Sequence, residues 1–397
     1  MTRQAADPIV ICSYARTPMG GFQGALAPVK ATELGSTAVK AALERAGASG
    51  EQVDKIFMGC VLPAGLGQAP ARQAALGAGL PKSVEAVTIN KVCGSGMQAA
   101  MFAHDMLAAG SADVIVAGGM ESMSNAPYLL QKHRAGARIG HDTVYDHMMG
   151  DGLEDAYEAG RAMGSFAEET ARDYQFTREM QDDYAVESLT RAQRAIEAGD
   201  FDREVTPVEV KTRKGVQTVD KDEQPLKADA AKIPTLRPAF AKDGTITAAN
   251  ASSISDGAAA LVMARQSVAE KLGLNIVARV VAHAGHAHEP AQFTTAPIPA
   301  MQKALDKAGW TVEDVDLFEV NEAFAVVAMA ARRDLRIPAE KMNVNGGATA
   351  LGHPIGASGA RILATLLSAL ETRGGKRGMA SLCIGGGEAT AMAVELV

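Results

Sequence analysis

The hydrophobic residues of this chain fall into short runs that alternate with segments of helical periodicity. Four runs are apolar and of strand length, at residues 8–15, 55–62, 84–90 and 114–117. Between the first two runs, residues 32–46 have the spacing of an amphipathic helix that ends at Gly47. Strands that alternate with helices in this way predict an α/β protein built in layers.

The same order of elements recurs near the C-terminus. Residues 87–121 and residues 342–388 each contain a strand ending in Asn, a loop of small residues, a Ser-Gly pair and a helix. In both segments a strand ending in glycines then follows, with Glu close behind. A repeat of this length, with matching order, predicts two halves of similar fold.

The composition and the hydrophobic pattern change between the two repeats. Residues 123–253 are more charged and less strand-like, and one amphipathic helix is clear, from Thr177 to Gly199. Residues 211–227 read as exposed loops. We therefore expect residues 123–253 to form a lid domain inserted between two halves.

The expected domains follow from the repeat and the insertion. The N-terminal half comprises residues 1–122 and 254–274, and the C-terminal half comprises residues 275–397. The predicted fold class is thus α/β, with two similar layered halves and an inserted lid domain.

Composition narrows the class of protein. Of 397 residues, 47% are hydrophobic, which is enough for a large core, and the net charge of −7 gives no overall field that would attract nucleic acid or an anionic membrane. No apolar run approaches the roughly 20 residues of a membrane span, and the start of the chain lacks the layout of a signal peptide. We expect a cytoplasmic protein with no nucleic-acid or membrane partner.

Four cysteines are present, and none forms a Cys-x-x-Cys pair. This pattern argues against a zinc ribbon and a disulfide framework.

Cys93 lies in NKVCGSGMQAAM, where a strand passes through a small-residue loop into a helix. Backbone N–H groups and the helix dipole there favour a nucleophilic thiolate. A buried structural cysteine is an equally common outcome, and GSGMQA also fits a dinucleotide fingerprint, although Asp113 precedes the next strand instead of ending it.

His353 lies in GGATALGHPIGASGARI, on a glycine-rich loop before a helix. Imidazole is a natural base for a thiol, although a lone histidine is more often structural. Cys93 and His353 precede corresponding helices of the repeat, so pseudo-twofold packing of the halves would bring their loops together.

Three further positions have both a chemical and a structural interpretation. Cys383 ends an apolar strand and enters a run of glycines, which can form an anion-binding nest or simply follow a core cysteine. Asn321 ends a strand, where Asn is usually a turn residue but can also hold a water. Ser252 lies in a small polar loop that could bond an amide-bearing ligand or merely be capped by its neighbours.

Histidines cluster in AHAGHAHEP, which contains His283, His286, His288 and Glu289. Their spacing matches no common zinc pattern, so a pocket wall or a surface turn is favoured over a metal site. We expect no bound metal.

Together, six segments of the chain resemble the thiolase family. They are NKVCGSGMQAA, GGMESMS, NASSISDGAAA, VNEAFA, NVNGGATALGHPIGASGARI and LCIGGGEATAMA, which occur in the family's order and span nearly the whole chain. The detailed sequence is most similar to the family members that join two acetyl-CoA into acetoacetyl-CoA, or run that reaction backwards. A broad 3-ketoacyl-CoA thiolase of fatty-acid degradation is the alternative.

The resemblance implies chemical roles for five residues. Cys93 would take the acyl group as a thioester, His353 would remove its proton, and Cys383 would remove a proton from the methyl group of the second acetyl-CoA. Asn321 would hold a water that forms an oxyanion site with His353. The backbone N–H groups of Cys93 and Gly385 would form a second oxyanion hole.

The resemblance also implies how the substrate is held and how the chain is assembled. Ser252 would contact the pantetheine arm of coenzyme A, and Lys227 stands beside Leu226, where the family often has a basic residue near the CoA phosphates. Ala162 replaces a histidine that contacts CoA in many members, and residues 288–300, which border the acyl pocket, depart from the biosynthetic pattern. The implied fold is an αβαβα sandwich in a homodimer or homotetramer. CoA is substrate and product, so no cofactor is expected.

Two other proteins of this fold fit less well. Ketoacyl synthases resemble this layout but use a second histidine where this chain has Asn321, and they lack the equivalent of Cys383. A non-catalytic CoA-binding scaffold should lack at least one of Cys93, His353 and Cys383, and all three are present.

Overall fold

A mixed sheet of ten strands runs through the whole computed structural model, which describes residues 7–397. Residues 1–6 of the expected N-terminal half lie outside the described residues. The order of the main strands is β12-β13-β14-β11-β1-β10-β5-β3-β4, and the short β2 (Gly20–Gly21) pairs with β10. The N-terminal region supplies β1 (Ile9–Arg16), β3 (Lys55–Gly59), β4 (Glu85–Ile89), β5 (Val114–Ser122) and β10 (Ser255–Arg265). The C-terminal region supplies β11 (Ala278–Ala287), β12 (Leu317–Val320), β13 (Arg377–Ile384) and β14 (Glu388–Leu396).

The four predicted strands and the first predicted helix are confirmed. The four apolar runs become β1, β3, β4 and β5, and the helical segment becomes α1 (Ala31–Ala46), which ends at Gly47 with φ 70°. Strand β1 is apolar because Ile9 and Ile11 face the central core while Val10 and Cys12 face the outer one. A strand buried on both faces has no polar side.

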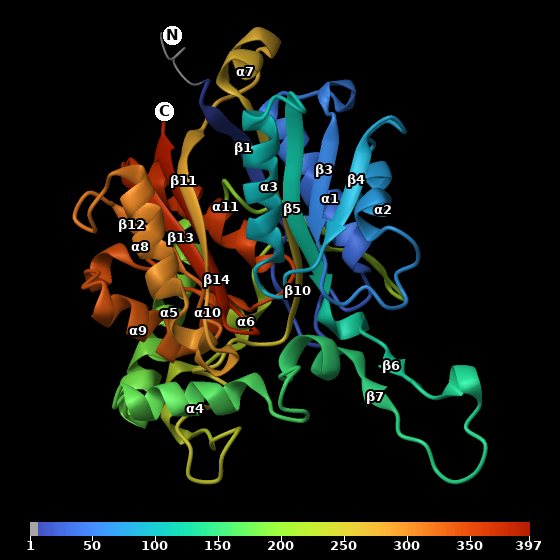
Figure 1. Cartoon of the computed structure of the whole chain (residues 1–397), viewed down its shortest axis with the longest axis vertical. Coiled ribbons are helices and arrows are strands. Elements are labelled where there is room, and N and C mark those ends of the chain that lie inside the picture. Colours follow the sequence, from blue (N-terminus) through green and yellow to red (C-terminus); the bar gives the residue numbers. More distant parts are fainter. Residues whose placement is uncertain (1–6) are drawn as a thin grey trace.

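Helices and sheet form five layers (Figure 1). Helices α1 and α2 (Pro70–Gly77) cover the outside of the N-terminal strands, while α8 (Pro297–Ala308) and α9 (Ala325–Asp334) cover the outside of the C-terminal strands. Helices α3 (Ser95–Ala108) and α11 (Ser358–Arg373) lie in the middle, in a core that includes strands of both halves. The smaller α7 (Gln266–Leu272) follows β10, and α10 (Ala348–Leu351) precedes α11. This is the expected αβαβα arrangement.

The strand pairing confirms the repeat. In the N-terminal half, β3 is parallel to β5, while β5, β10 and β1 pair antiparallel. The C-terminal half has the same pattern, with β12 parallel to β13, and β13, β14 and β11 antiparallel. The two halves join where β1 pairs with β11.

The strand expected at the start of the second repeat, ending in Asn, does not form. Met342 makes one parallel bridge to Phe318 of β12, where the first repeat has the full strand β4. The side chain of Asn343 accepts from the Val320 N–H and donates to the Val320 carbonyl, both at 2.8 Å. It therefore occupies the backbone groups that a ladder would use, and its own φ of 47° turns the chain away.

Residues 123–253 add no strand to the ten-stranded sheet. They form two small hairpins, β6 (Tyr128–Leu129) with β7 (Tyr145–Asp146) and β8 (Val208–Thr212) with β9 (Gly215–Val219), and the helices α4 (Met163–Asp173), α5 (Arg178–Ala198) and α6 (Glu223–Lys227). Helix α5 is the predicted amphipathic helix, and the Thr177 hydroxyl accepts from the Met180 N–H at its start. The division of the chain into domains remains a prediction.

Residues 211–227 are largely exposed, as predicted, but most of them do not form loops. They belong to the β8–β9 hairpin and to α6. Val208 and Val210 alternate with exposed residues and pack into the outer N-terminal core, and Gly215, with φ 119°, makes the turn. The alternation of Val208 and Val210 lies just before residues 211–227, and strand β9 within that segment is exposed, so the segment itself carries no strand pattern. Among the helices of residues 7–397, none has the length and apolar character needed to cross a membrane.

Helices α3 and α11 approach each other through the Ser-Gly pairs of the two repeats. A Cβ on Gly359 would lie 2.2 Å from the Met97 backbone nitrogen, and one on Gly96 would lie 2.7 Å from the Ala360 nitrogen. Neither backbone could tolerate a methyl group without shifting. The two glycines therefore set the distance between the halves.

We expect Gly359→Ala to destabilise the protein by about 1–3 kcal/mol because the added methyl overpacks this contact. In an open helix the same change would stabilise, since alanine is the better helix former. Gly150→Ala is the matched control, because a Cβ there meets no atom within 4 Å, and it should change stability by less than about 0.5 kcal/mol. Urea unfolding measures both variants, and equal stability would contradict the close contact.

Candidate active site

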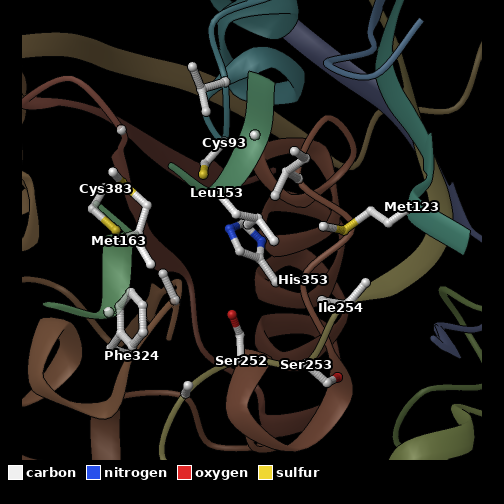
Figure 2. A pocket seen from close by; sticks show the side chains of 18 of the residues that line it. Cys93, Met123, Leu153, Met163, Ser252, Ser253, Ile254, Phe324, His353 and Cys383 are labelled. Atoms are coloured by element: carbon white, nitrogen blue, oxygen red, sulfur yellow. The ribbon is translucent and has the colours of Figure 1, made fainter. Parts of the chain in front are cut away.

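A pocket of about 390 Å³ lies where the two halves and the inserted segment meet (Figure 2). It contains Cys93, His353, Cys383, Ser252 and Gly385, so the structure brings together five of the predicted site residues. Most of the other lining side chains are apolar, and they include Met123, Met149, Leu153, Ala162, Met163, Phe240, Ile254, Phe293, Phe324 and Ile355. Apolar walls with a few polar groups are typical of small-molecule sites.

Cys93 lies in a tight loop between β4 and α3. The Ser95 hydroxyl closes the loop, accepting from the Lys91 N–H at 2.9 Å and donating to the Val92 carbonyl at 2.6 Å. A Cβ on Gly94 would lie 2.3 Å from the Cδ1 atom of Ile384, so a side chain there would have to displace that residue. These contacts hold the Cys93 loop against the pocket.

The pKa of the Cys93 thiol differs from the value that its place before a helix suggests. Burial raises it to about 11, although the backbone N–H groups of Gly385 and of Cys93 itself act in the opposite direction. The expected stabilisation of the thiolate is present, but desolvation outweighs it. The resting nucleophile is therefore a thiol, and it needs a base.

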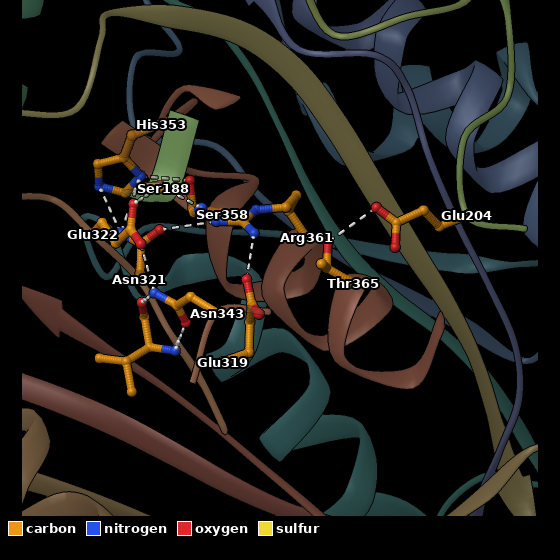
Figure 3. Close-up of polar contacts among 12 residues, drawn as sticks. Ser188, Glu204, Glu319, Asn321, Glu322, Asn343, His353, Ser358, Arg361 and Thr365 are labelled. Atoms are coloured by element: carbon orange, nitrogen blue, oxygen red, sulfur yellow. Dashed lines mark hydrogen bonds and ion pairs between the residues drawn. The ribbon is translucent and has the colours of Figure 1, made fainter. Parts of the chain in front are cut away.

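His353 can serve as that base because its imidazole is neutral. Burial and the nearby positive charge of Arg361 lower the pKa of His353 to about 3. The Ser358 hydroxyl donates to the Pro354 carbonyl at 2.9 Å, so its oxygen accepts from the Nδ1–H of His353 at 2.5 Å (Figure 3). This arrangement leaves Nε2 without a hydrogen and able to accept a proton.

Asn321 lies beside His353, directly after β12. Arg361 donates to the Asn321 Oδ1 at 3.3 Å and to Glu319 at 2.9 Å, so the Asn321 amide turns its Nδ2 toward His353, 3.5 Å from the ring nitrogens. Arg361 is fully buried. The charge of Arg361 orients the Asn321 amide and favours the neutral form of His353. Neither Arg361 nor Ser358, which lie in the first turn of α11, was identified from the sequence, because a helical sequence carries no sign of which groups its side chains face.

Cys383 ends β13 on the wall next to Cys93, and Figure 2 shows both side chains at the pocket. Burial, followed by the proximity of Cys93, raises the pKa of the Cys383 thiol well above its usual value. Gly385 follows in the glycine run, with its N–H directed at the Cys93 sulfur. One backbone donor and two thiols thus share a single apolar space.

Glu121 is a buried carboxylate next to this site that the sequence analysis did not single out. It accepts from the N–H groups of Val61 at 3.0 Å, Leu62 at 3.1 Å and Gly356 at 2.9 Å. Burial raises its pKa to about 7 against the effect of these donors. Glu121 therefore ties the loop of His353 to the N-terminal half. Its place after the Gly-Gly pair of the repeat was the available signal.

Two expected CoA contacts lie at different distances from the pocket. Ser252 lines it, and its N–H donates to the Ala323 carbonyl at 2.9 Å. Lys227 does not line it and lies exposed on α6, ion-paired with Glu223. Ala162 and Phe293 form part of the apolar wall, at the two places where the sequence departs from the family that it resembles.

The histidine cluster is not a wall of this pocket, and only His288 and Glu289 lie in the connection after β11. His283 and His286 lie on strand β11, and of the described residues lining the pocket none belongs to this strand.

Comparison with known proteins agrees with this architecture. Residues 9–267 match the family described as "Thiolase, N-terminal domain", and residues 274–396 match "Thiolase, C-terminal domain". Acetyl-CoA acetyltransferase 2 of Arabidopsis thaliana is 53% identical over 100% of this chain and 99% of its own length. Acetyl-CoA acetyltransferase of Escherichia coli is 51% identical over 97% of this chain and 98% of its own. The crystal structure of the Bacillus anthracis acetyl-CoA acetyltransferase superposes with a TM-score of 0.95 at 41% identity, covering 99% of this chain and all of that one.

Two similar halves that enclose a pocket with a thiol and an imidazole define an acyl-transferring enzyme. The chain belongs to the thiolase family.

The raised pKa of Cys93 predicts how the rate of its alkylation depends on pH. Because the thiol is protonated below pH 11, the rate of alkylation by iodoacetamide should rise about tenfold per pH unit from pH 7 to pH 10. Mass spectrometry of the Cys93 peptide follows the rate, with N-acetylcysteine, whose rate levels off near its pKa of roughly 8.5, as the control. A rate for Cys93 that levels off near pH 8 would show that its pKa is not raised.

Proposed function

We propose that this enzyme is an acetyl-CoA acetyltransferase, which reversibly joins two acetyl-CoA into acetoacetyl-CoA and CoA. The observation that carries the proposal is that Cys93, His353 and Cys383 line one pocket. The roughly 50% identity to acetyl-CoA acetyltransferases over the full length of the chain supports the substrate assignment.

In the first step the acetyl group moves to the protein. The Cys93 sulfur attacks the carbonyl of acetyl-CoA while its proton passes to Nε2 of His353. The carbonyl oxygen becomes negative and accepts from the N–H groups of Cys93 and Gly385. The C–S bond to CoA then breaks, His353 returns the proton to the leaving thiolate, and acetyl-Cys93 remains.

In the second step a carbon–carbon bond forms. Cys383 first passes its thiol proton to Nε2 of His353, and the resulting thiolate removes a proton from the methyl group of a second acetyl-CoA. The enolate oxygen accepts from this Nε2–H and from a water held by Asn321. A thiolate of high pKa is a strong base, which suits this weak carbon acid. The carbanion attacks acetyl-Cys93, the Cys93 sulfur leaves and takes the Nε2 proton from His353, and acetoacetyl-CoA is released while Cys383 keeps the proton of the methyl group.

The size and polarity of the pocket support short acyl groups. About 390 Å³ is near the lower end of the range for ligand sites, and Ser252 is available to the pantetheine arm. Lys227 is our proposed contact for the CoA phosphates on the outside. The reaction as proposed needs no cofactor, since CoA is substrate and product.

We also propose a cytoplasmic homodimer or homotetramer. All four cysteines lie in the described part of the chain and are free, which supports a reducing compartment. Exposed apolar side chains on β4 and around the β6–β7 hairpin support association with further copies. They include Val87, Tyr128, Leu130, Ile139 and Val144.

The substrate assignment is tested by thiolysis. Purified enzyme is given free CoA with either acetoacetyl-CoA or 3-ketodecanoyl-CoA, and loss of substrate absorbance is followed. Fast cleavage of the short substrate alone is expected, because the apolar pocket is small. Comparable rates on both would make the enzyme a broad 3-ketoacyl-CoA thiolase, and no cleavage of either would refute the proposed function.

The variant Cys383→Ser tests whether Cys93 is the nucleophile and Cys383 the base of the condensation step. This variant should still form acetyl-Cys93 from acetyl-CoA, seen as a mass increase of the intact protein, but condensation should fall by at least about 100-fold, the contribution typical of a general base. Cys93→Ala is the matched control, in which acylation and condensation should both disappear. Condensation at the wild-type rate in Cys383→Ser would place the base elsewhere.

A further inference from the structure

Two histidines and an aspartate meet on the surface, away from the active-site pocket. His104 and Asp105 belong to α3, and His283 belongs to β11. The three ligand-type atoms form a nearly equilateral triangle. Asp105 Oδ1 lies 3.0 Å from His104 Nδ1 and 2.8 Å from His283 Nε2, and the two nitrogens are 3.1 Å apart.

Hydrogen bonds among the three residues cannot account for all sides of this triangle. Each ring nitrogen carries at most one hydrogen. If both nitrogens donate to Asp105, their hydrogens face each other across 3.1 Å, and if one donates to the other nitrogen, it gives up Asp105. At least one close approach is therefore left without attraction.

A single cation satisfies all three sides at once. Ligand atoms on one face of an octahedron are separated by roughly 3.0 Å when the metal–ligand bonds are roughly 2.1 Å, whereas a tetrahedron requires roughly 3.4 Å. The observed separations of 2.8, 3.0 and 3.1 Å match the octahedral face. Two imidazoles and one carboxylate are a ligand set that divalent first-row transition metals favour.

We propose that His104, Asp105 and His283 bind one divalent transition-metal ion. Asp105 is exposed, so water can complete the coordination on the open side. Lys307 donates to the His283 carbonyl at 2.9 Å and fixes the backbone of that ligand.

The other histidines of the cluster have different contacts. His286 Nδ1 lies 2.9 Å from the Lys303 ammonium, and His288 Nε2 lies 2.7 Å from the Gln292 carbonyl. Spacing within AHAGHAHEP thus gave no zinc pattern because two of the three ligands come from another part of the chain.

The ion would join α3 to the C-terminal half of the sheet. Helix α3 begins just after Cys93, and β11 pairs with β14. Because only the folded chain brings these residues together, metal binding should stabilise the native state and raise the melting temperature.

Binding of Co²⁺ to the metal-free enzyme tests the site. Full-length protein is stripped with a chelator and titrated with Co²⁺ alone, by calorimetry, visible absorption and thermal melting. Wild type should bind one ion per chain, with the weak absorption of a nitrogen and oxygen site and a higher melting temperature. His283→Asn and Asp105→Asn should each weaken binding by at least the roughly 10- to 100-fold that is typical when a metal site loses supporting contacts. His286→Asn, on the same strand, should bind as wild type does.

Several results would overturn the proposal. Wild type that binds no Co²⁺ is one, and His283→Asn or Asp105→Asn that binds as tightly as His286→Asn is another. Intense thiolate-to-cobalt absorption that persists in these variants would place the ion at the active-site cysteines instead. Asp105 is exposed, so Asp105→Asn should fold even if loss of the half-buried His283 does not permit folding.

Discussion

The close contact between α3 and α11 governs the rest of this structure. Gly96 and Gly359 leave no side chain between the helix starts, so the two backbones meet almost directly. Each helix is preceded by a loop that carries a chemical group, Cys93 in one half and His353 in the other. Since the distance between the helices fixes the distance between the loops, the packing of two glycines determines whether thiol and imidazole share a pocket.

Buried charges hold this arrangement in one geometry. Glu121 links the loop of His353 to the N-terminal half, and Arg361 links Glu319 to Asn321. Glu322 accepts from the hydroxyl groups of Tyr184, Ser188 and Thr349, and so joins the inserted helix α5 to the C-terminal half. A buried charge that lost its partners would be costly, so these contacts form together or not at all.

The apolar pocket has opposite effects on the two groups that must exchange a proton. Burial raises the pKa of Cys93 to about 11 and lowers that of His353 to about 3, so the uncharged pair is favoured at rest. A thiolate can therefore form only as its charge passes to the carbonyl oxygen of a bound thioester, where the N–H groups of Cys93 and Gly385 receive it. In the proposed reaction the apolar site thus couples proton transfer to acyl transfer and leaves the nucleophile as a thiol when no substrate is bound.

The sequence by itself indicated an α/β repeat, and its resemblance to the thiolases implied the five layers and the chemical residues of the candidate site. Apolar runs, helix stops such as Gly47 and the order of motifs are local properties, so they could be predicted without coordinates. Only the tertiary structure decided what depends on residues far apart in the chain. Asn343 bonds to β12 and prevents an expected strand. Ser358 and Arg361 determine the tautomer and the neutral form of His353. His283 contacts His104 and Asp105 of α3. Periodicity records which side chains are buried, but not which groups they meet, because those partners are chosen by packing.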